Sequence, residues 1–572
     1  MEVRLASGLP ASTLSALLVA GFAASFGAQA QTSSTPKPII EELRQQERER
    51  ALREQQERTT DERLKPAAID AQSLPSGETP CFRIDRLVLA GELADEFQWA
   101  LRSASIPGDD WQGRCLGTAG INILLARVQQ AVIAKGFVTT RVLVGPQDLS
   151  AGTLTLTLVP SRIASIRFKD EAARTSLRTA IPTRVGELVN LRDIEQGLEN
   201  LKRLPTADAD IQIEASTAPD ARPGDSDLVV SYTQKRPLRA TLSLDDGGTD
   251  GTGKTQAGAT VAWDNPLGLN DLFYLSLNHD AFNHRGQGTA GQTVHYSVPH
   301  GDWLLSATAS QNDYHQSVAG LYETYVYSGD SSNAELRLAR LLYRDASRKT
   351  MASIRAFRRA SHNFIDDEEI GPQRRVVGGW EASFNHREFI GQATLDATLA
   401  YRRGTGAFGA IEAPEDPSEG TSRMKLFTTD VNLNAPFKLA GEQLRYSALW
   451  RAQWNRTPLT PQDRFAIGGR YTVRGFDGEN SLLGERGWLI RNDLGWALGQ
   501  SGAELYAGVD YGHIGGPSAD WQLGADLAGG VIGVRGAFRG LSYDFFVGAP
   551  IRKPEGFRTA KVTGGFTLNY SF

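Results

Sequence analysis

The chain ends in 562-VTGGFTLNYSF-572, a stretch in which apolar and polar side chains alternate. Successive side chains of a β-strand point to opposite faces, so the alternation separates two sets of residues. The apolar face carries Val562, Phe566, Leu568, Tyr570 and Phe572, and the polar face carries Thr563, Thr567, Asn569 and Ser571. Such a strand is typical of a transmembrane barrel with lipid outside and water inside. A soluble sandwich gives the same local pattern, so the stretch alone leaves both classes open.

The same alternation extends back along the chain to residue 236. It recurs at Leu238 to Leu244, at Ala259 to Trp263 and at Phe273 to Leu277, with a turn at 264-DNPLGLND-271. A tilted spanning strand takes about 9 to 11 residues. Residues 236–572 therefore accommodate roughly fourteen to eighteen strands with their turns and outer loops.

The N-terminus indicates export. Leu14 to Phe26 is an apolar run, and Ala28-Gln29-Ala30 follows it. We interpret residues 1–30 as a signal peptide, because the run is shorter than the ~20 residues that a spanning helix needs. No comparable run follows, so we expect no transmembrane helix in the mature chain. Three observations favour a transmembrane antiparallel β-barrel over a sandwich. The chain is exported, its alternating region is long for a sandwich, and that region reaches an aromatic last residue.

Residues 31–80 differ from the rest of the chain. The segment 38-PIIEELRQQERERALREQQER-58 is a charged helix with few apolar positions, which has no broad stripe to pack on a hydrophobic core. We expect an N-terminal helix over 31–58 that is either solvated or suited to a water-filled cavity. The composition of 59–80 is typical of a linker.

Two units of mixed α/β pattern lie between the linker and the barrel, at 81–160 and 161–235. The first has the order strand, helix, helix, strand, strand, and its second helix begins near Thr118. The order recurs in the second unit, where we expect a first helix over Glu171 to Thr179 and a helical stripe from Leu191 to Leu201. A repeated unit of roughly eighty residues predicts two copies of one small fold.

The only two cysteines are Cys81 and Cys115. In an exported chain such a pair predicts a disulfide, and two unpaired buried thiols are the alternative. A metal site is not supported, because no histidine lies near either cysteine.

Composition and motifs speak against several classes of function. A formal net charge of -5 with 61 basic and 66 acidic residues argues against a nucleic-acid surface. No hydrolase elbow or zinc-protease helix is present. The segment 248-GTDGTGKT-255 fits the spacing of a P-loop, but the residues after it alternate as a strand, which favours a Gly-rich turn. We expect 366-DDEE-369 to be a solvated outer loop rather than a cation site.

Several motifs together resemble one family. The stretches 465-FAIGGRYTVRGFDGE-479 and 486-RGWLIRNDLGW-496 look like the sixth extracellular loop and the adjacent strand of the superfamily that joins POTRA domains to an outer-membrane barrel. Three further segments, 145-GPQDLSAGTLTLTLVPSRI-163, 264-DNPLGLND-271 and 296-YSVPHGDW-303, resemble the outer-membrane transporters of two-partner secretion, which export filamentous haemagglutinins and haemolysins.

The resemblance implies a plug helix, two periplasmic POTRA domains and a barrel of about 16 strands whose loop near 465–485 folds into the lumen. It assigns the loop motif to Val473, Arg474, Gly475 and Phe476. Arg474 is expected to pair with an inward-facing carboxylate, and the Gly-x-Asp-x-Gly-like segment 508-GVDYG-512 assigns that role to Asp510 rather than to Asp493. Gly475 would allow a backbone turn that other residues resist. Phe572 resembles the terminal signal read by the barrel-assembly machinery.

The function implied is export of a haemagglutinin- or haemolysin-like exoprotein, recognised by its N-terminal secretion domain, without nucleotide, metal or other cofactor. The expected location is the bacterial outer membrane, with its lipids and the barrel-assembly machinery as further partners and no nucleic acid. An insertase of the same superfamily is the alternative, although insertases usually carry more POTRA domains and lack the plug helix. A simple porin would leave the two mixed units without a purpose.

Overall fold

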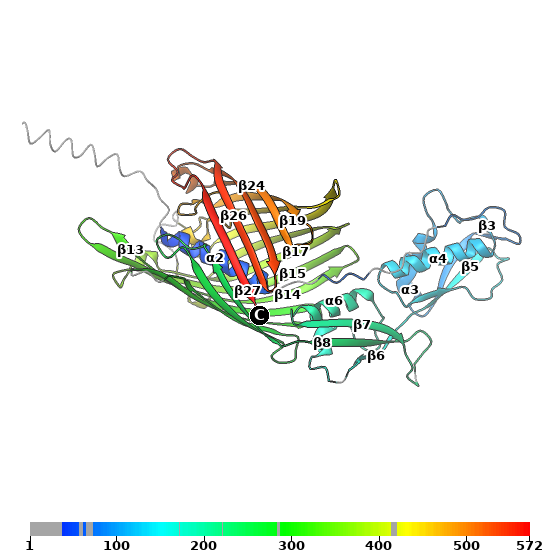
Figure 1. Ribbon diagram of the computed structural model, residues 1–572. Coiled ribbons are helices and arrows are strands. Elements are labelled where there is room, and N and C mark those ends of the chain that lie inside the picture. Colours follow the sequence, from blue (N-terminus) through cyan, green and yellow to red (C-terminus); the bar gives the residue numbers. More distant parts are fainter. Residues whose placement is uncertain are drawn as a thin grey trace, which may run out of the picture.

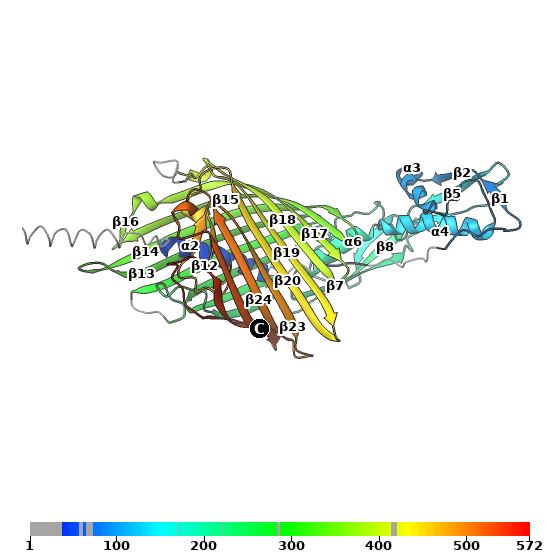
Figure 2. The ribbon, with the colours of Figure 1, turned by 90° about the horizontal axis from the view of Figure 1, so that it is seen from above.

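A computed structural model describes residues 37–56, 61–64, 72–170, 172–219, 221–282, 286–412 and 420–572. The predicted signal peptide at 1–30 lies outside the described residues, and so does part of the predicted linker at 59–80. The described chain forms a barrel with one helix inside it and two small mixed domains beyond one end, as Figures 1 and 2 show. We call the barrel end beside these domains the domain end and the opposite end the far end.

The barrel is closed and antiparallel, which confirms the predicted fold class. Sixteen long strands follow one another around it, and the two-residue strand β16 lies in the loop between β15 and β17. The strands are β9 (Leu238–Asp245), β10 (Gln256–Asp264), β11 (Leu272–Asp280), β12 (Gln287–His300), β13 (Trp303–Ala319), β14 (Thr324–Arg344), β15 (Arg348–Ile365), β16 (Glu368–Glu369), β17 (Arg375–Ile390), β18 (Ala393–Thr405), β19 (Lys425–Leu439), β20 (Glu442–Asn455), β23 (Arg486–Ala497), β24 (Ala503–Gly515), β25 (Asp526–Phe538), β26 (Leu541–Arg552) and β27 (Thr563–Ser571).

The alternation of the sequence places apolar side chains outside and polar side chains inside. On β10, Val261 and Trp263 are about half exposed on the outer surface, whereas Thr260 is buried and its hydroxyl lies 2.8 Å from that of Ser276 on β11. The barrel closes where β27 pairs with β9. This inside-out distribution matches a barrel whose outer surface faces lipid.

The first mixed domain packs two helical segments against small sheets. It contains β1 (Phe82–Ile84), β2 (Arg86–Gly91), α3 (Ala94–Phe97), the 3₁₀ helix η1 (Gln98–Ala104), β3 (Arg114–Leu116), α4 (Thr118–Ala134), β4 (Arg141–Leu143) and β5 (Thr153–Val159). The order β2-β5-β4 forms one sheet, and β1 pairs with β3. The helix begins at Thr118 as expected, but the sequence-based assignment of Thr118 as its cap is wrong, because Gly117 occupies the N-cap position. The short strand β3 was not predicted.

The second mixed domain repeats the pattern, and its first α-helix is as short as α3. It contains β6 (Ile163–Phe168), α5 (Leu177–Ala180), α6 (Leu191–Lys202), β7 (Ala207–Ala215) and β8 (Ser226–Gln234), with the sheet order β6-β8-β7. The helix predicted over Glu171 to Thr179 is wrong in extent, because only α5 is helical there. Ser176 ends the preceding extended segment and caps α5 by accepting a hydrogen bond from the Thr179 amide. A helix therefore begins only after that cap.

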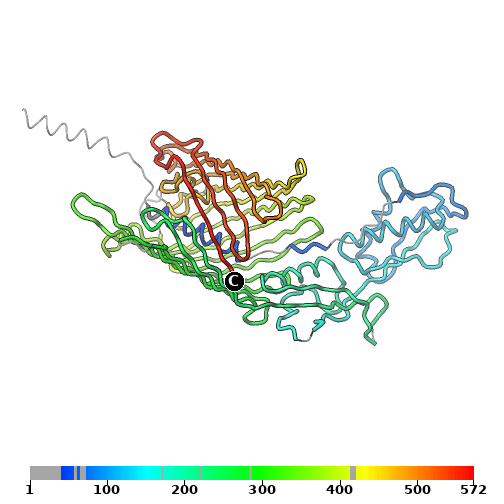
Figure 3. Tube along the Cα trace, in the orientation of Figure 1, coloured from blue at the N-terminus to red at the C-terminus, as the bar shows by residue number. Residues whose placement is uncertain are grey.

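The helix α2 (Lys37–Gln56) lies inside the barrel, as Figure 3 shows in blue. Its side chains contact β10, β13, β14 and β20, which lie at different positions around the wall. Among the described residues, no helix has the length and apolar character needed to cross a membrane.

Candidate functional site

The segment 456–485 between β20 and β23, which we call the lumen loop, folds back into the barrel. It contains the 3₁₀ helix η5 (Pro461–Asp463) and a small hairpin of β21 (Phe465–Ile467) and β22 (Leu482–Gly484). A buried apolar cluster joins this loop to the barrel wall, and it comprises Phe465, Ile467, Val473, Phe476, Leu482, Leu489, Ile514, Leu527 and Phe557. The loop thus has a core of its own inside the lumen.

Arg474 of the lumen loop makes contacts with two carboxylates at once. Its Nε lies 2.7 Å from Asp510 Oδ2 and its Nη2 lies 2.8 Å from Asp510 Oδ1, which is a bidentate pairing. Nη2 also lies 2.6 Å from Asp493 Oδ1, and the Arg474 amide donates to Asp510 Oδ2 at 3.0 Å. The Arg474 side chain is 5% exposed and that of Asp510 is 1% exposed. The structure therefore brings Arg474 together with both carboxylates that the sequence offered as alternatives.

Gly475 lies at a point where the loop touches the barrel backbone. Its φ is +90°, and a Cβ there would lie 2.5 Å from the Ala549 carbonyl oxygen on β26. Both the left-handed conformation and the backbone contact require glycine at this position. On either side, Val473 is fully buried and the Phe476 ring packs edge-on against Phe557, with 5.9 Å between centroids.

A second anchor joins the lumen loop to a different strand of the barrel wall, β15. Asp463 forms an ion pair with Arg359 of β15, and its Oδ2 accepts from the Thr460 hydroxyl at 3.0 Å. Gln453 of β20 donates to the Asp463 carbonyl at 2.8 Å. Sequence reasoning did not find this pair, because the segments of Asp463 and Arg359 carry no recognisable motif.

Polar contacts hold α2 in the lumen. Arg53 lies 2.5 Å from Glu335 of β14, and Glu47 lies 2.8 Å from Arg451 of β20. Arg44 donates to the Gly478 carbonyl, so the helix also contacts the lumen loop. These contacts involve ionic and amide groups, which water can replace, and the apolar Leu52 adds packing against the small cluster of Leu204, Ala262, Leu272 and Tyr274.

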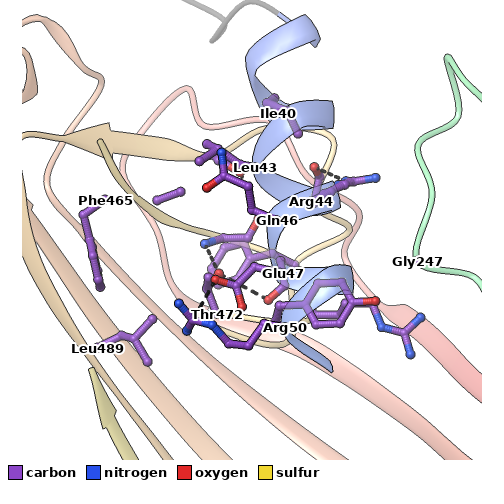
Figure 4. A pocket seen from close by; sticks show the side chains of 18 of the residues that line it. Ile40, Leu43, Arg44, Gln46, Glu47, Arg50, Gly247, Phe465, Thr472 and Leu489 are labelled. Carbon is purple, nitrogen blue, oxygen red and sulfur yellow. Dashed lines mark hydrogen bonds and ion pairs between the residues drawn. The ribbon is translucent and has the colours of Figure 1, made fainter. Parts of the chain in front are cut away.

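A cavity of about 200 Å³ remains between the helix, the lumen loop and the wall. In Figure 4, Leu43 and Glu47 of α2 lie on one side of it, and Phe465 and Leu489 lie on the other. The helix therefore fills the lumen without packing tightly against the loop.

The second mixed domain is attached to the barrel through two of the motifs that marked the family resemblance. In the turn 264-DNPLGLND-271, Asn270 Nδ2 donates to the Ser176 carbonyl at 2.8 Å. In 296-YSVPHGDW-303, the Gly301 carbonyl accepts from Asn200 of α6 at 2.8 Å. These motifs thus form the contact between domain and barrel.

Arg344, at the end of β14, joins three parts of the molecule. Its guanidinium lies 3.0 Å from Glu195 Oε2 and 2.9 Å from Glu199 Oε1, both on α6. It also donates to the Glu62 carbonyl in the segment that follows α2, and the Leu64 amide donates to Glu195 at 2.8 Å. This buried cluster connects the barrel, the second domain and the chain leading from the helix.

The remaining predicted residues lie away from the lumen. Cys81 and Cys115 form a disulfide in the first domain, with 5.3 Å between their Cα atoms. Beside it, Glu78 accepts from the amides of Gly117, Ala119 and Gly120 and so caps α4. Phe572 exchanges two backbone hydrogen bonds with Ala240 of β9, at 3.0 and 3.2 Å. Sequence reasoning missed Glu78, since its partners lie some forty residues away.

The P-loop-like segment 248–255 and the acidic segment 366–369 both lie between long strands of the barrel. Residues 248–255 belong to the turn between β9 and β10, where the Thr252 hydroxyl donates to Glu41 of α2 at 3.0 Å. Residues 366–369 lie in the exposed loop that contains β16. The described residues contain no group of three or more His, Cys, Asp or Glu side chains that could hold a metal ion.

Comparison with known families assigns most of the chain. The family described as haemolysin secretion/activation protein ShlB/FhaC/HecB matches residues 224–536. A POTRA domain of ShlB type matches residues 83–161, and a further POTRA domain matches 162–215.

Individual relatives agree with this assignment. The chain is 38% identical to outer membrane transporter CdiB-2 of Burkholderia pseudomallei (strain 1026b), over 86% of this chain and 87% of the relative. It is 29% identical to outer membrane transporter CdiB of Dickeya dadantii (strain 3937), over 80% and 82% of the two chains. The solved structure of CdiB from Acinetobacter baumannii superposes with a TM-score of 0.81 at 28% identity, over 94% of this chain and 99% of that one.

Proposed function

We propose a transport mechanism for this chain, which belongs to the haemolysin secretion/activation protein family ShlB/FhaC/HecB. It is a transporter of the bacterial outer membrane that exports a secreted partner protein, with its two POTRA domains in the periplasm. The domain end of the barrel is therefore periplasmic, and the far end is extracellular. The mechanism concerns the capture of the partner, the opening of the lumen and the assembly of the barrel.

The POTRA domains capture the partner by adding an extended segment of it to a sheet edge. In the second domain, β6 and β7 are the outer strands of the three-stranded sheet, so their outer edges carry backbone groups available for such pairing. The partner proposed is a haemagglutinin- or haemolysin-like exoprotein with an N-terminal secretion domain. Related chains of Proteus mirabilis and Serratia marcescens bear the name haemolysin transporter, which supports that class of partner.

The observation that carries the mechanism is the polar character of the plug. A helix held by ion pairs and amides can exchange these partners for water, whereas a helix packed through a broad apolar stripe would have to expose that surface. The helix α2 therefore leaves the lumen when the partner engages, and the unfolded partner passes through the space it vacates. Arg474 meanwhile keeps the lumen loop attached to β23 and β24.

Assembly of the barrel is proposed to depend on the last strand. Phe572 exposes 67% of its surface at the periplasmic end of β27, where the barrel-assembly machinery could read its ring. This role rests on the resemblance of the terminal strand to the known signal, together with the exposure of Phe572.

An insertase is the alternative function within the superfamily. Membership of a family of secretion and activation proteins favours export. A helix that fills the lumen also has no evident use in an insertase.

Export is tested by expressing the chain with the exoprotein encoded beside it and following that exoprotein in medium and periplasm. Removal of residues 81–235 should abolish export while the barrel remains in the outer membrane. A variant that lacks only 81–160 serves as the matched control for the contribution of each domain. Normal export without both domains would contradict the proposal, and loss of other outer-membrane barrels with export intact would favour the insertase.

A further inference from the structure

The barrel closes through its shortest ladder. The strands β27 and β9 pair from Thr567↔Asp245 to Ser571↔Thr241, and Phe572 and Ala240 extend this pairing by one position. The run is still shorter than that between any other neighbouring long strands of the described barrel. Beyond it, the Asp246 amide reaches the Phe566 carbonyl at 3.4 Å, which is a long hydrogen bond. The first residues of β27 thus have no ladder to β9 at the extracellular end, and other contacts must close the seam there.

Arg470 of the lumen loop supplies those contacts. Its Nη1 lies 2.6 Å from Asp246 Oδ1, directly after β9. Its Nη2 lies 2.7 Å from the Thr567 hydroxyl and 3.3 Å from the Phe566 carbonyl, both on β27. One guanidinium therefore bridges the first and the last strand of the barrel.

The carboxylate that Arg470 binds completes the bridge. Asp246 Oδ1 also accepts from the Phe566 amide at 2.9 Å, so the acid contacts β27 as well. The side chains of Arg470 and Asp246 are 17% and 13% exposed. Hydrogen bonds with ionised partners are roughly twice as strong as neutral ones. This group of contacts is thus a substantial part of what joins the two strands at this end.

The same stretch of the lumen loop is in contact with the plug. Arg44 of α2 donates to Gly478, and Glu479 accepts from the Asp250 amide at 3.0 Å in the turn after β9. The helix also contacts that turn through Glu41 and Thr252. Departure of the helix would remove contacts from both sides of the Arg470 bridge.

We propose that Arg470 is a positioning residue that holds the β9–β27 seam closed at its extracellular end while α2 occupies the lumen. The seam is secured by the lumen loop in addition to its own short ladder, so the state of the plug determines how firmly the barrel is closed. This role concerns the empty transporter and does not depend on which exoprotein it exports.

The test measures conductance of the purified full-length protein in planar bilayers, which needs no exoprotein. Arg470→Ala should raise the frequency of open events several-fold, because the bridge is lost while Arg474 keeps the loop in the lumen. Arg445→Ala is the matched control. Arg445 is a lumenal arginine paired with Glu504 at 2.8 Å, remote from the seam, and its removal should leave the open frequency unchanged.

A disulfide across the seam tests whether Arg470→Ala acts by opening the seam or by loosening the plug. Ser243 and Asn569 are register partners on the inward faces of β9 and β27. In Arg470→Ala combined with Ser243→Cys and Asn569→Cys, oxidation should restore the closed behaviour and reduction should release it again. The Arg470→Ala variant with native Ser243 and Asn569, measured in the same reductant, controls for the native disulfide.

Two results would overturn the proposal. One is an open frequency in Arg470→Ala equal to that of the unaltered protein. The other is a raised open frequency that persists when the seam is cross-linked, which would place the effect in the plug. If Arg470→Ala fails to form a heat-modifiable barrel, Thr567→Val provides the test, because it removes the hydroxyl on β27 and keeps both charges. It should give a smaller increase in the same direction.

Discussion

At the scale of single residues, Arg474 shows why a buried ion pair can hold a mobile loop. Its guanidinium is shared by Asp510 on β24 and Asp493 on β23, so one cation faces two carboxylates. Arg535 lies 3.3 Å from Asp493 and supplies part of the balancing charge. Removing one partner of a buried pair is costly, because the remaining charge is left without compensation.

The two carboxylates should therefore differ in their importance. Asp510 accepts three hydrogen bonds from Arg474, whereas Asp493 accepts one and has Arg535 as a second partner. Asp510→Asn should weaken the loop attachment by about 3 kcal/mol, within the range for a broken buried pair, and reduce export strongly. Asp493→Asn should have a clearly smaller effect. Export assays with protease accessibility of the lumen loop measure both, and equal effects would contradict this ranking.

Asp193 gives a prediction for pH at the contact between the second POTRA domain and the barrel. Burial, together with the nearby charges of Asp302 and Glu187, raises the pKa of Asp193 from 3.8 to about 6. The folded state then holds a proton that the unfolded state has released. The contribution of Asp193 to the free energy of unfolding is therefore most favourable below about pH 4, falls as the pH rises towards 6, and stays reduced above pH 6.

Hydrogen exchange of α6 and of the turn around Asp302 measures this effect in the full-length protein. Protection factors, which are corrected for the intrinsic exchange rate at each pH, should be higher at pH 4.5 than at pH 7, with a slope of at most about 1.4 kcal/mol per pH unit. In Asp193→Asn the dependence should largely disappear. A variant with the same pH dependence as the unaltered protein would contradict the assignment to Asp193.

At the scale of elements, α2 is a helix whose surface is mostly polar, so water can solvate it. Its charged side chains reach Glu335, Arg451 and the lumen loop, whereas its apolar side chains are few: Leu43 borders a cavity and Leu52 packs against a small apolar cluster. An apolar stripe would have fixed it against the wall through the hydrophobic effect. The polar surface instead makes the helix stable inside the lumen and able to leave it.

Charge reversal at Arg53 should therefore open the channel. Arg53→Glu places a carboxylate beside Glu335, which lies 2.5 Å from Arg53 in the native protein. Repulsion should displace the helix and raise the mean conductance several-fold, towards the value reached when residues 31–58 are deleted. Arg50→Glu is the control with a smaller expected effect, because Arg50 is 44% exposed and lies 3.6 Å from Asp430. If Arg53→Glu and the deletion of residues 31–58 both conduct like the unaltered protein, the helix does not restrict the channel.

The elements also show what the sequence could reveal. Alternation in residues 236–572 suffices to predict strands, and the missing apolar stripe of 38–58 suggests a water-filled environment. The sequence pattern could not predict β3, because its three residues pair with β1 only after the chain has folded back on itself. The helix expected from Glu171 was too long, because the helical spacing of apolar residues does not reveal a cap at Ser176.

At the scale of the whole molecule, contacts among the described residues link the second POTRA domain, the plug helix and the extracellular end. Arg344 connects α6 with Glu62 in the segment that follows α2, and α2 contacts the lumen loop through Arg44. The lumen loop in turn reaches the barrel wall through Arg474 and the seam through Arg470. Binding of a partner to the second POTRA domain can thus act on the plug through neighbouring contacts.

The architecture as a whole was predictable, whereas the contacts between its parts were not. Motif order, strand alternation and the resemblance to a family identified the domains, the barrel and Arg474. The motif led to Asp510 rather than Asp493, but the sequence did not reveal that Arg474 contacts both, because only the three-dimensional geometry of the adjacent strands brings the two carboxylates to one arginine. The pair Asp463–Arg359 and the cluster around Arg344 join residues over a hundred positions apart. No local sequence pattern indicates contacts between residues so far apart in the chain.

The measurement that tests this account most directly is export with α2 locked in the lumen. Asn312 Nδ2 of β13 donates to Glu49 Oε1 of α2 at 3.2 Å, so a reducible bis-methanethiosulfonate cross-linker can join Glu49→Cys to Asn312→Cys across the space that the two side chains occupy. Each single cysteine variant, treated with the same cross-linker and reductant, is the control. Export should stop in the cross-linked double variant and return on reduction, because the partner passes through the space that the helix vacates. Undiminished export with the helix locked would show that the partner does not pass through this lumen.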